Sequence, residues 1–303
     1  MEKFGRKYQI VFNIGYLTQV GKYDRATIVD TIIIEYPLTT DFAISRNTYS
    51  QVNTGFLTIY GLAQSTRDRL HKDRYDVNNY IGVEVRAGYE DGMSLIFKGT
   101  VKECQSYKES GGTEYRTEVE AWDGGLNIYL GEDNDSFSAQ VDKATILETL
   151  CQNMPTIKVG AISDDFYNES TLRPCIFSGK TYEDLKTICD GQLFIDCEKI
   201  YFMNDNDVID GEIASLDVDS GILGSPRRRE STLKVQLIFE PRVIVGQWLT
   251  VTSSSLPYLN GTYKVLGVAH DGTISGAKCG NMITTIDLFI GTQVFRRVEK
   301  KNV

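Results

Sequence analysis

Few residues in this chain have the chemistry that catalysis needs. Only two histidines occur, His71 and His270, so a Ser-His-Asp or Cys-His centre would have to use one of them. We expect His71 to lie on a polar helix and His270 to lie at a turn beside Asp271, where adjacent side chains point apart. No G-x-S-x-G motif accompanies either histidine. The sequence therefore predicts no catalytic residue.

The acidic clusters do not match a metal-binding pattern. Residues 205–207 (Asp-Asn-Asp) begin like a calcium loop, but Ile209 and Asp210 stand where a ligand and a glycine are required. We interpret this run as a solvated loop. Residues 132–135 (Glu-Asp-Asn-Asp) are interpreted as a domain boundary, with cation binding as the lesser alternative. Clustered Cys or His for zinc and glycine loops for phosphate are both missing, so we predict no metal and no cofactor.

The most prominent charged feature is the triplet Arg227, Arg228 and Arg229, which follows a Gly-Ser-Pro sequence. A guanidinium binds a carboxylate through two parallel hydrogen bonds, so the triplet could clamp acidic groups of a neighbouring subunit or domain. A linker that simply stays soluble is the alternative. These three arginines are our candidate interface residues.

The composition is typical of a folded protein of two or three domains with many strands. The chain has 303 residues, with 17 Tyr and 13 Phe but only 6 Pro, and aromatic residues favour strands. The net charge of −9 disfavours nucleic-acid binding, which depends on cationic side chains. An acidic surface would still suit a wall past which DNA slides, because like charges suppress adhesion.

The six cysteines include no C-x-x-C pair, and we expect them to be reduced. We predict no signal peptide, because the N-terminus lacks a long apolar core. We also predict no membrane insertion, because no stretch approaches the ~18 apolar residues that cross a bilayer. The chain is therefore expected to be made in a reducing cytoplasm.

Hydrophobic periodicity divides the chain into three regions. Residues 1–133 alternate with period two, as in residues 83–89, which is typical of a sheet with one buried face. A short helix capped by Ser65 or Thr66 and running as far as Arg74 is expected to interrupt these strands.

Residues 134–216 change to helical periodicity. We expect one helix to be capped by Asp142 and ended by Pro155, and a second to stop at Gly191. A tight hairpin turning at residues 197–198 follows. These features predict a small α+β module.

Residues 217–303 comprise the arginine linker and a second β region. We expect strand reversals at residues 260–261 (Asn-Gly) and 271–272 (Asp-Gly), and a basic tail beyond Gly291. The predicted fold class is therefore mainly β, with two similar β modules flanking an unlike α+β insertion.

The ordered motifs resemble one known family, the baseplate hub proteins of contractile-tailed bacteriophages (the Mu-like and late-control-D-like tail hubs). In the first region the resemblance is carried by residues 55–70, 83–91 and 95–101. In the middle region it is carried by Asp-Gly-Gln-Leu-Phe-Ile at 190–195 and the hairpin that follows. In the last region it is carried by residues 221–229, 241–246 and 260–270.

The resemblance implies a structural protein and not an enzyme. Hubs of this family are homotrimers in which each chain supplies two tube-protein-like β-barrels, so that three chains make a pseudo-sixfold ring. The ring joins the hexameric tail tube protein to the trimeric spike protein, with the tape measure protein and other baseplate proteins as further partners and DNA only in transit. The implied location is the virion tail baseplate, assembled in the host cytoplasm.

Two other functions stay open from the residues. One is a tail-associated glycan hydrolase, which would need a carboxylic acid of raised pKa in a cleft. The other is a module that binds a host receptor or carbohydrate through aromatic loops. The sequence leaves the partner chains, the bore size and the tail type undetermined.

Overall fold

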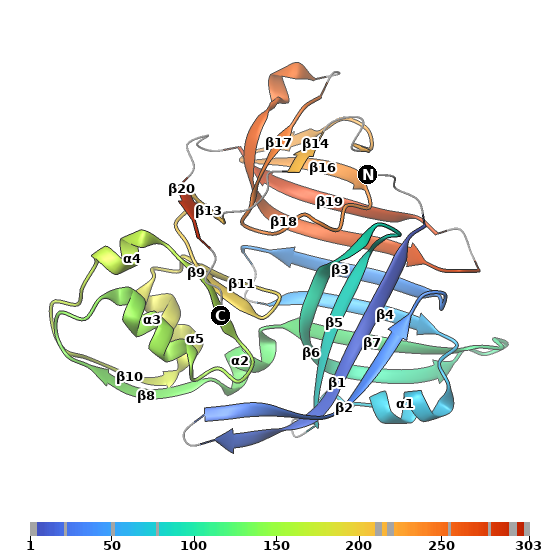
Figure 1. The fold of residues 1–303 in the computed structure, drawn as a ribbon, viewed down its shortest axis with the longest axis horizontal. Helices are drawn as coiled ribbons and strands as arrows, with labels where there is room; N and C mark the ends of the chain where they lie inside the picture. Colours follow the sequence, from blue (N-terminus) through green and yellow to red (C-terminus); the bar gives the residue numbers. More distant parts are fainter. Residues whose placement is uncertain are drawn as a thin grey trace.

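A computed structural model describes residues 5–20, 23–49, 52–76, 79–209, 214–216, 221–253, 256–277, 280–290 and 296–299. Strands dominate these residues and the helices are short, so the prediction of a mainly β chain is confirmed. Figure 1 shows two strand-rich parts in contact with each other, with the small α+β module as a lobe to one side.

The first region consists of antiparallel strands and one short helix. Its elements are β1 (Lys7–Val20), β2 (Tyr23–Glu35), β3 (Thr40–Asn47), β4 (Asn53–Tyr60), α1 (Gln64–Leu70), β5 (Asn79–Tyr89), β6 (Gly92–Lys108) and β7 (Tyr115–Asp123). Val83 and Val85 are buried as the alternation predicts. The expected cap at Ser65 or Thr66 is wrong, because the N-cap is Ala63 and no side chain caps the helix. The helix ends before Arg74 because Lys72 already bonds to Cys104 of β6.

The middle region is the predicted α+β mixture. Its elements are α2 (Gly125–Leu130), β8 (Glu132–Phe137), α3 (Lys143–Cys151), β9 (Lys158–Ile162), α4 (Asp164–Asn168), β10 (Cys175–Lys180), α5 (Thr181–Ile188), β11 (Leu193–Asp196), β12 (Lys199–Phe202), β13 (Asp207–Ile209) and β14 (Ala214–Leu216). The Asp142 cap is confirmed, since its carboxylate accepts the N–H of Thr145 at 2.7 Å. Helix α3 ends at Cys151, before Pro155, and Gly191 after α5 has the left-handed φ of +76°.

The last region is again β. Its elements are β15 (Arg227–Arg229), β16 (Thr232–Ile238), β17 (Trp248–Val251), a 3-10 turn at Pro257–Leu259, β18 (Gly261–Ile274), β19 (Met282–Phe289) and β20 (Arg296–Val298). The reversal expected at residues 271–272 is wrong, because β18 continues to Ile274 while its residues 267–274 pair with β3. His270 therefore lies inside a strand and is fully buried, not at a turn.

The two β regions share one continuous sheet. Its hydrogen-bonded path runs β15-β16-β19-β18-β3-β4-β7-β6-β5-β1-β2, and β17 and β14 branch from β18. Within the described chain the path is open at β15 and β2, so neither region closes into a barrel by strand pairing. The expectation of two separate barrels stays a prediction.

The strand order of the first region recurs in the last. The order β3-β4-β7-β6-β5 is matched by β15-β16-β19-β18-β17, and every neighbouring pair in both series is antiparallel. The series differ beyond this point, because β1 is antiparallel to β5 whereas β14 is parallel to β17. The domain boundaries at 133/134 and 216/217 stay predictions.

Hydrophobic packing crosses the boundaries between the regions. The core of the first region includes Phe239, Ile274 and Met282 from the last region. The core of the last region includes Phe194 and Tyr201 from the middle module. Because protein interiors are close-packed, such shared cores restrict relative movement of the parts.

The described part of the chain contains no helix that is long and apolar enough to span a membrane. All five described cysteines are free thiols, and Cys279 lies outside the described residues.

Candidate functional site

The two β regions meet where β3 pairs with the second half of β18, and we call this pairing the seam. Its register runs from Gly267 opposite Asn47 to Ile274 opposite Thr40. Across it, the hydroxyl of Thr273 donates to Asp41 at 2.6 Å. Outside the seam, the phenol of Tyr89 at the end of β5 donates to the carbonyl of Phe239 at 2.7 Å. Backbone and side-chain bonds therefore both join the two β regions, which are far apart in sequence.

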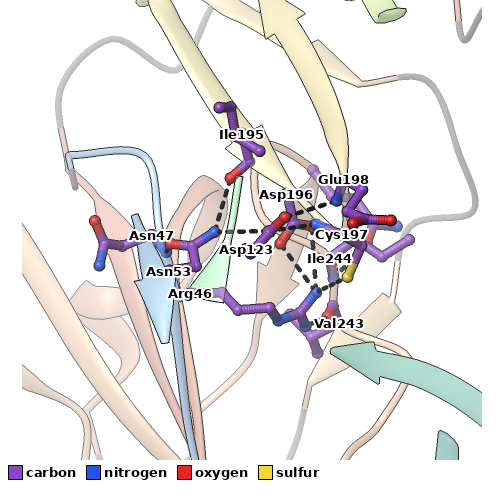
Figure 2. Close-up of polar contacts among 11 residues, drawn as sticks. Arg46, Asn47, Asn53, Asp123, Ile195, Asp196, Cys197, Glu198, Val243 and Ile244 are labelled. Carbon is purple, nitrogen blue, oxygen red and sulfur yellow. Dashed lines mark hydrogen bonds and ion pairs between the residues drawn. The ribbon is translucent and has the colours of Figure 1, made fainter. Parts of the chain in front are cut away.

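A buried arginine connects the seam with the middle module. Arg46 of β3 is 2% exposed, and its Nη1 lies 3.2 Å from both carboxylate oxygens of Asp196 at the end of β11. Its Nη2 donates to the carbonyl of Val243 at 3.1 Å. Figure 2 shows these bonds converging on one guanidinium. A single side chain thus links all three regions.

Asp123, at the end of β7, holds the turn between β11 and β12. Its carboxylate accepts the backbone N–H groups of Cys197 at 2.6 Å and Glu198 at 2.7 Å (Figure 2). Both turn residues have positive φ, +53° and +57°, which is costly for residues other than glycine. Successive N–H groups in such a conformation form a concave anion site. The carboxylate therefore stabilises a turn that would otherwise be strained.

Asn53 of β4 completes the arrangement. Its side-chain amide donates to the carbonyl of Ile195 at 2.7 Å and lies 3.4 Å from an oxygen of Asp123 (Figure 2). We call Arg46, Asn53, Asp123, Asp196, Cys197 and Glu198 the junction cluster.

Burial dominates the electrostatics of the junction cluster. It raises the pKa of Asp196, and the positive charge of Arg46 opposes the rise. Burial, and next the charge of Asp196, raise the pKa of Asp123 well above its usual range. Burial also raises the pKa of the Cys197 thiol well above its usual value. A thiol that stays protonated is a poor nucleophile.

The junction cluster is therefore suited to fixing the relative position of the regions. Among the described residues, no group of three or more His, Cys, Asp or Glu is placed to hold a metal ion. The alternation of β3 could have revealed Arg46, because Thr40, Phe42, Ile44 and Arg46 share its buried face. A charged residue on a buried face requires a partner, but the sequence did not identify that partner.

The candidate interface arginines lie apart from the junction cluster. Arg227, Arg228 and Arg229 form β15, a hairpin strand with β16, and all three are exposed. They make no ion pair with any residue that the structure describes. Their role as an interface stays a prediction.

The two histidines lie in different settings. His270 is fully buried, with Nδ1 3.0 Å from the hydroxyl of Thr284 and its ring edge-on to Phe239. Burial, and then the charge of Arg46, lower the pKa of His270 well below its usual value. His71 follows α1 and is exposed.

The two acidic runs have structural positions. Asp207 of residues 205–207 is fully buried at the start of β13 and accepts a bond from Arg296 at 2.9 Å, so the run is not simply a solvated loop. Residues 132–135 lie in β8 and pair with β10. Burial and the neighbouring Asp184 raise the pKa of Asp133 to about 6, which is the property expected of a hydrolase acid. The side chain is buried, however, and a glycan could not reach it.

Comparison with known proteins identifies relatives. The family model described as "Baseplate hub gp41" matches residues 18–273. No curated protein sequence matches significantly. Among solved structures, the 43 kDa tail protein of prophage MuSo2 from Shewanella oneidensis is 10% identical, with a TM-score of 0.59 over 92% of this chain and 96% of that chain. A tail protein from Neisseria meningitidis MC58 is also 10% identical, with a TM-score of 0.58 over 96% and 98%.

A more distant similarity extends to a larger protein. The Francisella PdpA-VgrG complex contains a chain that is 8% identical, with a TM-score of 0.52 over 98% of this chain and 55% of that chain. At such low identities these structures show a shared fold. The family match covers most of the chain, and the protein therefore belongs to the baseplate hub gp41 family, a family of structural components of the phage tail.

Proposed function

We propose that this chain is the trimeric adaptor of a phage baseplate, joining a hexameric tail tube to a trimeric spike. The observation that carries the proposal is the strand order repeated between the first and last regions. Two similar units per chain give six similar units in a cyclic trimer. Such a ring can contact a sixfold partner on one side and a threefold partner on the other.

The seam and the junction cluster suit this role, because an adaptor must hold its two units at a fixed angle. Backbone pairing joins the two β regions in one sheet, and Arg46 links both regions to the middle module. A buried ion pair restricts the number of arrangements that the parts can adopt. The angle between the units would then be a property of the single chain before assembly.

The surface of β2 also favours assembly. Ile28, Val29 and Ile33 are 44%, 64% and 55% exposed on a strand that pairs only with β1 in the described chain. Figure 1 shows the far end of the β1–β2 pair, beyond the part of β1 that pairs with β5, projecting from the rest of the molecule. Exposed apolar side chains along an unpaired strand edge are typical of surfaces that another chain covers.

The proposed partners follow from the family and its structural relatives. The tail tube protein and the spike protein would contact opposite faces of the ring, with the tape measure protein as a further partner. One solved relative lies in a complex named for VgrG. The net charge of −9 suits a bore that DNA passes without adhering. The location would be the tail baseplate of the virion, after assembly in the host cytoplasm.

Mass measurement of the full chain by light scattering tests the proposal. We expect a species of three times the 34.0 kDa chain mass, and electron-microscope class averages with six similar lobes around a channel. A single-copy species at every concentration, including in the presence of a tail tube protein, would contradict the adaptor function.

The raised pKa of Asp133, which lies outside the junction cluster, is the observation that we use to test the glycan hydrolase alternative. That function requires peptidoglycan turnover by the purified chain, and Asp133→Asn should abolish it. We expect no turnover from either protein. Tight carbohydrate binding by a single copy of the chain would instead favour the receptor-binding alternative.

A further inference from the structure

Each of the two repeated units has an edge strand, β3 in the first and β15 in the last, that could pair with a strand of another unit. Among the described residues, only β3 pairs in this way. In the seam, β3 covers the second half of β18. The equivalents of these two strands are β15 and β6, which lie apart with six strands between them in the sheet. Within the described chain, β15 pairs only with β16, and no strand pairing joins β15 to β6.

Two β-bulges fix the register between the repeated units. In β6 the pairing with β7 shifts between Val101 and Glu103. In β18 the pairing with β19 shifts between Val265 and Gly267. Because bulges mark specific positions in a strand, we align these two.

The alignment brings together two matching polar pairs. It places Ser106 at the position of His270, and Thr117 at the position of Thr284. The hydroxyls of Ser106 and Thr117 lie 2.9 Å apart, and His270 Nδ1 lies 3.0 Å from the hydroxyl of Thr284. Both threonines are fully buried. The same cross-strand bond in both units supports the register.

The same alignment assigns each arginine of β15 an equivalent in β3. Thr117 lies opposite Ile59 and Thr284 lies opposite Leu237, so Gly55, four residues before Ile59, corresponds to Leu233. Arg228 lies opposite Leu233, as Ile44 lies opposite Gly55. In the seam Ile44 lies opposite His270, whose equivalent is Ser106. Repeating the seam between copies would therefore place Arg228 opposite Ser106.

The free backbone groups of both strands fit this pairing. Cys104 of β6 exchanges two backbone bonds with Lys72, and Ser106, two residues later, directs its backbone groups to the same edge. No strand of the described chain pairs with that edge beyond Cys104. In an antiparallel hairpin, hydrogen-bonded and non-hydrogen-bonded pairs alternate along the strand. Arg229, next to the turn, and Arg227 direct their backbone groups toward β16, so the backbone groups of Arg228 point away from it.

We propose that β15 of one copy pairs antiparallel with residues 105–108 of β6 in the next copy, with Arg229 opposite Gln105 and Arg227 opposite Tyr107. This proposal deepens the proposed trimeric function and rests on it. The contact joins different surfaces of the two copies, and such a contact closes into a ring when repeated around an axis.

An acidic residue on this surface complements Arg229, whereas Arg227 would share a row with Tyr107 and with Arg116, whose guanidinium already pairs with Glu109. Glu118 of β7 lies opposite Gln105 and is exposed, and it makes no ion pair with a described residue. Its carboxylate accepts a hydrogen bond from the phenol of Tyr107. Opposite residues of a sheet share one face, so Arg229, Gln105 and Glu118 would lie in one row. The backbones of Arg229 and Glu118 would be about 10 Å apart, a gap that their two long side chains can bridge across Gln105. The pairing would provide a carboxylate for a guanidinium that has none within the described chain.

Disulfide trapping in the full chain tests the pairing. Directly opposite residues have Cβ atoms about 4.5–5.5 Å apart, a separation that small local shifts reduce to disulfide range. On mild oxidation, the double variant Arg229→Cys with Gln105→Cys should give covalently linked dimers and trimers on a non-reducing gel. The matched control combines Arg229→Cys with Thr58→Cys, whose strand β4 is separated from β6 by β7, and it should give only the background of the single variants.

A charge exchange provides an independent readout. Arg229→Glu alone and Glu118→Arg alone should each raise the concentration for half-assembly by about tenfold, and the double exchange should restore assembly. A wild-type trimer with no specific cross-link and no charge rescue would overturn the pairing and leave the adaptor function standing. A wild-type chain that stays a single copy would overturn the adaptor function itself.

Discussion

Strands β3 and β15 occupy equivalent places in the two β regions, yet they have opposite surfaces. β3 is covered by β18, and its alternate residues, among them Phe42 and Ile44, are buried. β15 consists of Arg227–Arg229 and is exposed, with Pro226 directly before it. Charged residues and proline discourage indiscriminate pairing at an open sheet edge. The difference supports the proposal that the chain uses one edge internally and leaves the other for a neighbouring copy.

The largest expected effect comes from removing the buried ion pair that Arg46 of β3 makes with Asp196. Arg46→Met leaves the carboxylate of Asp196 buried without its partner, and we expect a loss of about 3–5 kcal/mol in the free energy of unfolding. Urea titration at a concentration where the chain is a single copy measures this loss. The control Arg227→Met removes an exposed arginine and should change stability by less than about 0.5 kcal/mol. Equal effects of the two substitutions would contradict the distinction between the two strands.

The second prediction compares equivalent positions directly. Ile44→Ala deletes a side chain that is 1% exposed, and the resulting cavity should cost about 2–5 kcal/mol. Arg228→Ala at the equivalent place in β15 should leave the single-copy stability within about 0.5 kcal/mol of wild type. Thermal and urea unfolding of both variants check the contrast. A small cost at Ile44 would show that the seam is not closely packed.

The third prediction uses the histidine of the seam. Burial lowers the pKa of His270, so the unfolded chain binds a proton that the folded chain does not. The contribution of His270 to stability should therefore be full above pH ~6.5 and fall by about 1–2 kcal/mol by pH 5. His270→Gln should remove this loss, whereas His71→Gln at an exposed site should retain it. Urea titrations across this pH range measure the free energy of unfolding of both variants. If the two variants lost the same stability on acidification, the loss could not be due to His270.

The smallest expected effect comes from Asp133→Asn, which we compare with the same substitution at a second buried carboxylate, Asp196. Asp196 has Arg46 as a partner, whereas Asp133 lies beside Asp184 and has its pKa raised to about 6. Because its carboxyl pKa is raised, the contribution of Asp133 to stability falls as pH rises from about 4 to 6. Asp133→Asn should therefore stabilise the fold at pH 7.5 by about 1 kcal/mol and have little effect at pH 4. Burial raises the pKa of Asp196 as well, but Asp196→Asn should destabilise the fold at pH 7.5, because it leaves the buried Arg46 without its carboxylate partner. Thermal unfolding at the two pH values distinguishes these outcomes.

Several local features could be predicted from the sequence because neighbouring residues determine them. The Asp142 cap and the left-handed Gly191 depend on bonds within a few residues. The turn at residues 197–198 also lies where the hairpin pattern placed it. The alternation of β5 required only a buried face on one side of the sheet. The family resemblance added the assembly context, which the family match confirms at the level of a baseplate hub.

The sequence prediction was wrong where distant strands compete with local turn signals. Residues 271–272 have the composition of a turn, but β3 pairs with them across more than two hundred residues and keeps them extended. The same pairing buries His270. Backbone hydrogen bonds and apolar burial along eight paired positions outweigh a local turn preference, which is a small contribution for each residue.

By itself, the sequence determined the fold class, the α+β insertion and the local caps and turns, because period-two alternation and capping bonds depend on residues close in the chain. Only the tertiary structure revealed the seam and the junction cluster. Arg46 lies 150 residues from Asp196 and 197 from Val243. Partners at such separations are determined by the packing of whole sheets. Many acidic residues of this chain could pair with one buried arginine, and only the strand order determines which of them lies close to it.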